Sequence, residues 1–239
     1  FNMVCFDFKI NTNRKNEGAV GKLKYLKVLA RLRRYINEMK PDLLHSHYAS
    51  SYGFLGALSG FHPYVISVWG DDVFEFPNKS IFHKNLLKFN LLKSDCILST
   101  SNIMLKETKK YTSKSILVTP FGIDLEFFKP LVVDSIFDKH DIVIGTIKTL
   151  EEKYGVEYLI RAFKILTDRN PTFPLKLLIV GIGSQEGYLK RLVSELGLNN
   201  HVVFTGRVDY SKVPCYQNML DVSVSVSTSD GESFGVAVI

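Results

Sequence analysis

The run Asp221-Val222-Ser223-Val224-Ser225-Val226-Ser227, followed closely by Asp230-Gly231-Glu232-Ser233-Phe234-Gly235-Val236-Ala237-Val238-Ile239, decides the fold. A strand-like segment ends in small polar residues. It is followed by an acidic residue, a glycine step and the apolar start of a buried helix. This order predicts a strand–loop–helix unit with a carboxylate and unpaired backbone N–H groups at its mouth. Ligands of open α/β sheets bind at such strand ends, and helix N-termini attract phosphate.

Strand-like and helix-like segments alternate along the whole chain. The runs Tyr64–Trp69 and Leu175–Val180 are continuous and apolar, as expected of strands buried on both faces of a parallel sheet. Runs with an apolar residue every three or four positions, such as Ile81–Lys93 and Val156–Arg169, predict helices between the strands. This alternation predicts an α/β protein built on doubly wound parallel sheets.

The pattern stops and restarts once. Residues 130–140 have no clear period and are interpreted as an interdomain linker, after which a strand begins at Asp141. We therefore predict two Rossmann-like domains, residues 1–130 and 131–239, that face a cleft, the usual place for a small-molecule site. The remaining predicted helices cover residues 22–40, 46–60, 102–111, 186–196 and 213–219, and the remaining strands residues 4–10, 42–45, 96–99, 115–118, 141–147, 202–205 and 221–227.

Composition bounds the class of protein. A chain of 239 residues with 46% hydrophobic and 23% charged residues is globular and has ample material for two cores. No apolar run is long enough to span a bilayer. Because Cys5, Cys96 and Cys215 are odd in number and far apart, we expect buried thiols rather than a disulfide or a metal site, and a reducing, cytoplasmic setting.

The net charge of +6 is carried by the first half of the chain. Residues 1–130 contain 19 Lys and Arg against 11 Asp and Glu, whereas residues 131–239 contain 11 against 13. One face of the predicted helix at residues 22–40 is basic and carries Lys24, Lys27, Arg31 and Arg34; another is apolar and carries Tyr25, Leu29, Leu32, Ile36 and Met39. The basic face is either a solvated surface, the more frequent case, or a contact with an anionic membrane surface.

Two lysines closely follow a predicted strand. Lys148 and Lys153 lie in the loop after residues 141–147. Two ammonium groups that converge on one point would suit a diphosphate. From spacing alone, solvated loop lysines are an equally good interpretation.

Two further patterns have structural interpretations. Gly181-Ile182-Gly183 opens a helix after a buried strand, but Glu186 stands where a dinucleotide fingerprint has its third glycine, so a tight strand–helix turn is favoured. His45 and His47 would point to the same side of a strand, and without further ligands nearby a hydrogen-bonded histidine is favoured over a metal site. Neither a Gly-x-Ser-x-Gly elbow nor a complete Walker loop occurs, which disfavours hydrolases and P-loop proteins.

Asp71 and Asp72 directly follow the predicted strand Tyr64–Trp69. A carboxylate at this position could orient or deprotonate an acceptor hydroxyl. Capping of a turn or a helix is the structural alternative.

Five stretches resemble, in the right order, the retaining GT-B glycosyltransferases of family 4, the glycosyl transferases group 1. They are Asp42-Leu43-Leu44-His45-Ser46-His47, Pro120-Phe121-Gly122-Ile123-Asp124, the pair Lys148 and Lys153, Phe204-Thr205-Gly206-Arg207-Val208, and Asp230-Gly231-Glu232-Ser233-Phe234-Gly235, which looks like the start of a Glu-x7-Glu signature. The resemblance covers essentially the whole chain. It implies an acceptor-side first domain, a second domain that binds a nucleotide-sugar donor, and catalysis without a metal or other cofactor.

The resemblance also implies roles for single residues. Lys148 and Lys153 would neutralise the diphosphate as it leaves the donor sugar. Glu232 would accept hydrogen bonds from donor hydroxyls and is a candidate catalytic residue, and the main chain at Val208 would touch the base. The implied donor-binding residues are Lys148, Lys153, Gly206, Val208, Glu232, Phe234, Gly235 and Val236.

The sequence departs from the family at three places. Trp69 stands where the family often has an active-site histidine; it could supply an apolar wall or stack on a sugar. Asp72 matches the acidic position that follows and is a second candidate catalytic residue, with Trp69 and Asp71 on the acceptor side. The signature's second glutamate would fall just after Ile239, and the family's N-terminal glycine-rich loop is missing. We therefore expect a fragment that lacks both ends, has an incomplete second domain and is inactive by itself.

Together these features predict an enzyme that moves a sugar, with retention of configuration, from a nucleotide-sugar to a glycan or lipid-linked acceptor of a cell-surface polysaccharide, lipopolysaccharide or glycolipid. It would act in the cytoplasm, peripherally on the inner face of the cytoplasmic membrane, with residues 22–40 on the lipid. Two alternatives stay open. One is an epimerase-like GT-B enzyme acting on free nucleotide sugars. The other is a basic nucleic-acid-binding module, which is disfavoured because no basic face with interleaved aromatic residues is recognisable.

Overall fold

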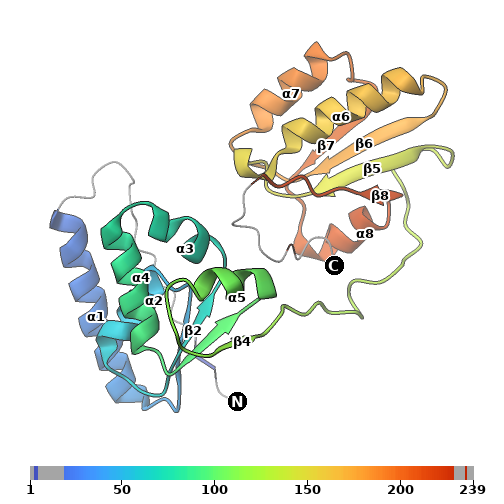
Figure 1. The fold of residues 1–239 in the computed structure, drawn as a ribbon. Coiled ribbons are helices and arrows are strands. Elements are labelled where there is room, and N and C mark those ends of the chain that lie inside the picture. Colours follow the sequence, from blue (N-terminus) through green and yellow to red (C-terminus); the bar gives the residue numbers. More distant parts are fainter. Residues whose placement is uncertain (1–2, 5–18, 229–234, 236–239) are drawn as a thin grey trace. The chain divides into compact units, whose positions relative to one another are not determined.

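The computed structural model describes residues 3–4, 19–228 and 235. Its contacts divide the chain into two compact units, residues 1–120 and 121–239. Each unit contains a parallel four-stranded sheet with helices packed on it (Figure 1), which confirms the predicted α/β architecture of two doubly wound domains. The predicted strand at residues 4–10 lies outside the described residues, apart from Val4.

The first unit has the strand order β1-β2-β3-β4, so each strand pairs with its successor in the chain through a helical crossover. Ser67 of β2 lies opposite His47 of β1 and Leu98 of β3 in the parallel register. The elements are α1 (Ala19–Met39), β1 (Leu44–His47), α2 (Ser51–Ser59), β2 (Tyr64–Val68), α3 (Asp71–Phe74), the 3-10 helix η1 (Phe76–Asn78), α4 (Ile81–Lys93), β3 (Cys96–Ser99), α5 (Asn102–Thr108) and β4 (Ile116–Val118).

The core of the first unit forms where α4 and α5 cover the central strands. Buried residues at alternate positions of β2, Ile66 and Val68, share one cluster with Leu87 and Leu91 of α4. Helix α1 adds its predicted apolar stripe, since Leu29 and Leu32 are buried against Leu55 of α2 and Ile36 packs beside them. Met39 was expected in this stripe but is 46% exposed at the end of the helix.

The second unit has the strand order β7-β6-β5-β8, so the chain returns past β5 to place β8 on the other side. The elements are β5 (Ile142–Ile147), the 3-10 helix η2 (Glu152–Tyr154), α6 (Val156–Arg169), β6 (Leu175–Val180), α7 (Glu186–Glu195), β7 (Val202–Gly206), the 3-10 helix η3 (Tyr210–Lys212), α8 (Val213–Gln217) and β8 (Val222–Ser223).

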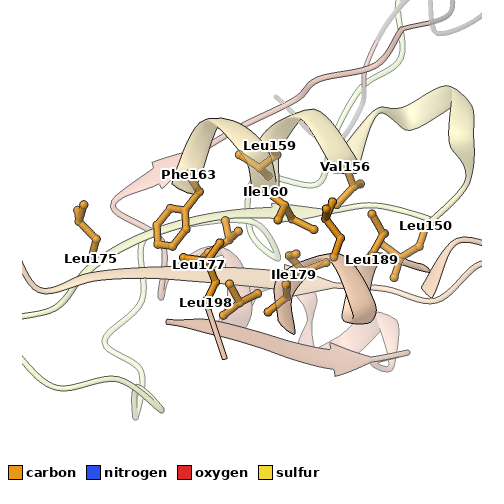
Figure 2. Packing of buried hydrophobic residues seen from close by; sticks show 13 residues of the cluster. Leu150, Val156, Leu159, Ile160, Phe163, Leu175, Leu177, Ile179, Leu189 and Leu198 are labelled. Atoms are coloured by element: carbon orange, nitrogen blue, oxygen red, sulfur yellow. The ribbon is translucent and has the colours of Figure 1, made fainter. Parts of the chain in front are cut away.

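Helices cover both faces of this second sheet, because successive residues of β6 point to opposite sides. Leu177 and Ile179 pack against α6 and α7 in the cluster shown in Figure 2, together with Ile160 and Phe163 of α6. Leu178 and Val180 belong to a separate cluster that contains Tyr216, Met219 and Leu220 from α8 and the turn after it. The buried strand predicted at 175–180 therefore has the two-sided environment that its continuous apolar sequence indicates.

The segment predicted as a linker, residues 130–140, belongs to the second unit. The side chain of Asn218, directly after α8, holds it in place. Asn218 Oδ1 accepts from the Leu131 N–H (2.8 Å) and Nδ2 donates to the Lys129 carbonyl (3.0 Å). Phe137 adds an apolar contact to the same face of the sheet. The units divide at Pro120, earlier than the predicted boundary at residue 130.

Candidate functional site

Loops from all four strands of the second sheet meet at its carboxyl edge. The Gly181 N–H after β6 donates to the Gly206 carbonyl at the end of β7 (3.0 Å), and the Leu150 N–H after β5 donates to the Ile182 carbonyl (3.0 Å). The Thr228 N–H, after β8, donates to the Lys153 carbonyl (2.9 Å). Main-chain hydrogen bonds therefore join the loops that carry the predicted donor-binding residues.

The structure brings Lys148 and Lys153 together around one aromatic ring. The Nζ atoms of Lys148 and Lys153 lie 4.7 Å and 5.3 Å from the centroid of the Tyr154 ring. Lys148 is half-buried, and its burial lowers the pKa of its ammonium group, as does the positive charge of Lys153. Lys153 is exposed. Two cations, one of them partly desolvated, thus stand at the edge of the sheet where an anion would stabilise both.

The turn predicted at Gly181-Ile182-Gly183 is confirmed, and its first glycine is required by close packing. Gly181 has φ +141°, and a Cβ atom there would lie 1.9 Å from the Lys148 carbonyl oxygen. Only a residue without a side chain fits such a backbone approach. The glycine therefore lets the loop after β6 lie directly against the loop that begins with Lys148.

Glu151 links the same two loops through its side chain. Its Oε1 accepts from the Ser184 N–H (2.9 Å) and its Oε2 from the Ser184 hydroxyl (2.5 Å). These two hydrogen bonds, with the positive charge of Lys153 as a smaller cause, lower the pKa of Glu151 below its ordinary value. The sequence prediction missed this pair, because the 33 positions that separate the residues hide the contact.

The chain after β8 passes directly over the loop between β5 and α6, residues 148–155, which we call the lysine loop. Thr228 donates to the Lys153 carbonyl from both its N–H and its hydroxyl (3.2 Å). Gly155 has φ +62°, and a Cβ atom there would lie 2.3 Å from the Val226 carbonyl oxygen. The segment that leads toward Glu232 is therefore anchored next to Lys153. Glu232, Phe234 and Val236 lie outside the described residues, and Gly235 is half-buried with φ +66°.

Gly206 and Val208 lie where the predicted base-binding loop begins. Gly206 ends β7 with φ +71°, which turns the chain away from the strand. The Val208 side chain packs against the buried cluster of Val143, Leu178 and Val180. The packing accounts for the Val208 side chain, and contact of the Val208 main chain with a base stays a prediction.

In the first unit, Asp72 is fully buried and ties together the ends of two strands. Its Oδ2 accepts from the Ala49 N–H (2.6 Å), and its Oδ1 accepts from the N–H groups of Trp69 (3.0 Å) and Gly70 (2.9 Å). Burial raises the pKa of Asp72, and these N–H donors act in the opposite direction. The geometry gives Asp72 a structural task at the carboxyl edge of the first sheet, and its catalytic role stays a prediction.

The loop that Asp72 holds contains a residue with an unusual backbone. Tyr48 has φ +92°, a left-handed conformation that residues with side chains rarely adopt. From α4, the buried Asn90 donates through Nδ2 to the carbonyls of Ala49 (2.9 Å) and Ser50 (3.0 Å). Asp72 and Asn90 therefore hold the loop from both sides. Neither contact has a signature in the sequence, where this stretch was predicted as helix.

Aromatic side chains lie at the same edge. The Trp69 ring is 41% exposed and meets the exposed His47 edge-on, with ring centroids 5.6 Å apart. His45 is hydrogen-bonded through Nε2 to Ser67 Oγ (2.8 Å), as predicted. Burial lowers the pKa of His45, and the neighbouring His47 lowers it further. Asp71, two residues after Trp69 in the first turn of α3, is half-buried.

Within residues 3–4, 19–228 and 235, no group of three or more His, Cys, Asp or Glu side chains could hold a metal ion. None of the helices in this part of the chain is both long and apolar enough to cross a membrane.

Cys96 and Cys215 carry free thiols and are half-buried, so they are less enclosed than predicted; Cys5 lies outside the described residues.

Comparisons with known proteins place the chain in a family. Residues 5–101 match the family described as "Glycosyl transferase 4-like", and residues 131–239 match "Glycosyl transferases group 1". The fold is similar to that of HepE from Anabaena, solved in complex with UDP, with a TM-score of 0.69 at 17% identity over 85% of this chain and 57% of that one. The chain belongs to the GT-B glycosyltransferases. This confirms the glycosyltransferase family indicated by the five sequence stretches, whereas retention of configuration stays a prediction.

Curated glycosyltransferases are similar in sequence. An uncharacterized glycosyltransferase of Methanocaldococcus jannaschii, MJ1178, is 25% identical over 202 residues, which are 83% of this chain and 52% of the relative. TuaC of Bacillus subtilis, provisionally named a teichuronic acid biosynthesis glycosyltransferase, is 30% identical over 95 residues, which are 38% of this chain and 24% of the relative. The chain thus spans about half the length of MJ1178 and about a quarter of that of TuaC.

Proposed function

We propose that this chain is the core of an enzyme that transfers a sugar from a nucleotide-sugar to a glycan or lipid-linked acceptor, with retention of configuration, in the synthesis of a cell-surface polysaccharide, lipopolysaccharide or glycolipid. The observation that carries the proposal is the gathering of the Lys148 and Lys153 ammonium groups at the carboxyl edge of the second sheet. The UDP in the complex of HepE and the polymer in the provisional name of TuaC support the choice of donor and product.

The chemistry follows from where charge develops during transfer. When the bond between the sugar and the diphosphate breaks, negative charge accumulates on the departing nucleoside diphosphate. Lys148 and Lys153 would neutralise this charge without a metal ion. Cations already in place at a partly desolvated edge stabilise the departing group without reorganisation. Glu232 would receive hydrogen bonds from the donor hydroxyls, and the main chain at Phe234, Gly235 and Val236 would face the sugar and phosphate.

The first unit would present the acceptor. Trp69 offers an exposed aromatic face of the kind on which sugars stack, and the neighbouring Asp71 could orient an acceptor hydroxyl. Asp72 accepts three main-chain hydrogen bonds and would hold the loops at this edge of the sheet in place, besides its proposed catalytic role.

We further propose that the first unit binds an anionic membrane surface. The exposed side chains of Lys27, Arg31 and Arg34 line α1. Helix α4 adds exposed lysines and a turn in which Ile81 and Phe82 are 73% and 65% exposed. Cations around exposed apolar side chains complement anionic lipid headgroups. Although Arg34 pairs with Glu38, both side chains are at least half exposed, so that pair is weak and would yield to a phosphate.

The membrane proposal is tested by co-sedimentation with vesicles. The chain should sediment with phosphatidylglycerol vesicles and stay in solution with phosphatidylcholine vesicles. Salt at 0.5 M should release it from the former, because charge attraction is then screened within about a few ångströms. Sedimentation that is the same with both lipids or unchanged by salt would contradict it.

The donor proposal is tested by binding. We expect UDP-, GDP- or ADP-glucose to raise the melting temperature of the chain, because a ligand that binds only the folded state stabilises it by mass action. Calorimetric titration of the active nucleotide would then give its affinity. Absence of a response to all three donors and to the free diphosphates would refute donor binding by this chain.

A further inference from the structure

The Tyr154 ring lies close to both ammonium groups of the lysine pair. The ring is half-buried and lies within 6 Å of both ammonium groups, at 4.7 Å for Lys148 and 5.3 Å for Lys153. We propose that Tyr154 is a positioning residue, which holds the two ammonium groups together as a receptor for the diphosphate of a nucleoside diphosphate. The inference rests on the proposed donor role of the two lysines.

The physical need for such a residue comes from the charges. Two like charges at one place repel each other, and long lysine side chains have ample freedom to separate in water. The face of an aromatic ring is negative and attracts a cation at this distance, more strongly when the cation is partly removed from water. Lys148 is in that situation, since it is half-buried. One ring thus lies close enough to both cations to offset part of the repulsion between them.

The position of the ring is set by the fold and does not depend on a ligand. The Tyr154 N–H donates to the Glu151 carbonyl (3.0 Å), which closes the 3-10 helix η2, and the next residue, Gly155, donates to the Glu152 carbonyl (3.0 Å). On the other side, the Lys153 carbonyl is held by Thr228. Because the backbone on both sides of Tyr154 is fixed, the ring is preorganised, and little conformational entropy is lost when a diphosphate binds.

A purely structural role for Tyr154 would lead to different behaviour from the role proposed. If the ring only filled space, its removal would weaken binding of the diphosphate and binding of the nucleoside to the same extent. A ring that positions two cations acts on the diphosphate and leaves the nucleoside unaffected. It also acts through its π face, which phenylalanine shares, so the hydroxyl is dispensable.

The experiment compares UDP with uridine on four forms of the 239-residue chain, by calorimetry or ligand-observed NMR: the wild type, Tyr154→Phe, Tyr154→Leu and the control Tyr35→Leu. Tyr35 is a matched control because it carries a similar contact, with the Arg31 guanidinium carbon 5.7 Å from its ring centroid, in the other unit. GDP and ADP, with guanosine and adenosine, are used in the same way if UDP is not the nucleotide that binds.

We expect Tyr154→Leu to weaken UDP binding about ten-fold, as loss of two cation–π contacts predicts, with uridine binding unchanged. Tyr154→Phe and Tyr35→Leu should bind UDP like the wild type. Equal UDP affinity for Tyr154→Leu and the wild type, equal losses for UDP and uridine, or a Tyr154→Phe variant as weak as Tyr154→Leu would each overturn the inference. Failure of the wild type to bind any nucleoside diphosphate would instead refute the proposed function.

Discussion

Glu151 and Ser184, on loops that follow different strands, are joined by two hydrogen bonds to one carboxylate, from the Ser184 N–H (2.9 Å) and from its hydroxyl (2.5 Å). The pair fastens the loop that carries Lys148 and Lys153 to the glycine turn after β6. A carboxylate rather than an amide is suited to this task because it accepts both bonds as an anion, and charged acceptors form stronger hydrogen bonds.

The first prediction concerns the pH dependence of this contact. The pKa of Glu151 is lower in the folded chain than its reference value of 4.5. The ionised form is therefore bound more favourably in the native state, and the resulting stability is present above the unfolded pKa and lost as pH falls through the folded pKa. We expect Glu151→Gln to lower the melting temperature at pH 7, and the difference from wild type to shrink on acidification below about pH 4.5. A pH-independent difference would show that the charge contributes nothing.

The second prediction concerns the glycine turn. Gly181→Ala should destabilise the second unit by about 3 kcal/mol or more, because the new Cβ would meet the Lys148 carbonyl at 1.9 Å and the backbone is in a region that alanine avoids. Gly187→Ala, at the start of α7, is the matched control: its Cβ would meet only Arg191 Nη1, at 3.9 Å, and it should stabilise by about 0.5 kcal/mol. Urea unfolding followed by far-UV circular dichroism measures both. Equal stability of the two variants would contradict the close approach.

The third prediction concerns the buried carboxylate of the first unit. Asp72→Ala leaves three main-chain N–H groups without their acceptor and should destabilise this unit by about 3 kcal/mol or more. Asp72→Asn keeps one oxygen and should cost less. Trp69 is the chain's single tryptophan, so its fluorescence reports unfolding of this unit. Glu38→Ala, which removes an exposed partner of Arg34 in the same unit, is the control and should change stability by less than about 0.5 kcal/mol. An Asp72→Ala variant as stable as this control would remove the structural role.

The fourth prediction separates the two lysines. Lys148→Ala and Lys153→Ala should each weaken binding of a nucleoside diphosphate by about ten-fold or more, since each removes a charged partner of the phosphates. The loss should be larger for Lys148, which is half-buried and therefore less screened by water than the exposed Lys153. Lys164→Ala on α6, which removes a half-buried lysine paired with Asp168, serves as the control. Calorimetric titrations at low and at 0.5 M salt would test the ranking; equal affinities for all three variants would remove both lysines from the site.

The sequence predicted the strand–helix alternation well where local signals determine an element's ends. The helix at Ile81–Lys93 agrees at both ends, and Ser80 caps its start, with its hydroxyl accepting from the His83 N–H. The predicted helix at 46–60 begins too early by comparison with α2, which starts at Ser51. Asp72 and Asn90 hold residues 48–50 as a loop, and these tertiary contacts are invisible in local periodicity. The strand predicted to end at Ser227 is shorter in the structure, where only Val222–Ser223 pairs with β5.

The candidate site was predictable in part. The spacing of Lys148 and Lys153 after a strand indicated that they could converge, and the structure brings them to one ring. The ring itself was overlooked, since a tyrosine next to a lysine has no distinctive spacing. Asp72 was identified by its position after a predicted strand. Its burial goes with a hydrogen bond from the Ala49 N–H, 23 residues earlier in the chain, which the sequence does not reveal. Sequence patterns thus located the sheet edges, whereas long-range hydrogen bonds decide how each edge is shaped.

The double hydrogen bond from Thr228 to the Lys153 carbonyl has a consequence for folding. It joins residues 75 positions apart, so it can form only after the intervening strands have assembled. Contacts of such sequence separation are entropically costly and slow to form, and they come late unless they belong to the nucleus. The lysine loop should therefore acquire its final shape in one of the last steps, when the chain beyond β8 docks. A nascent chain that has made β5, β6 and β7 would already possess the second core while its proposed anion receptor is still open.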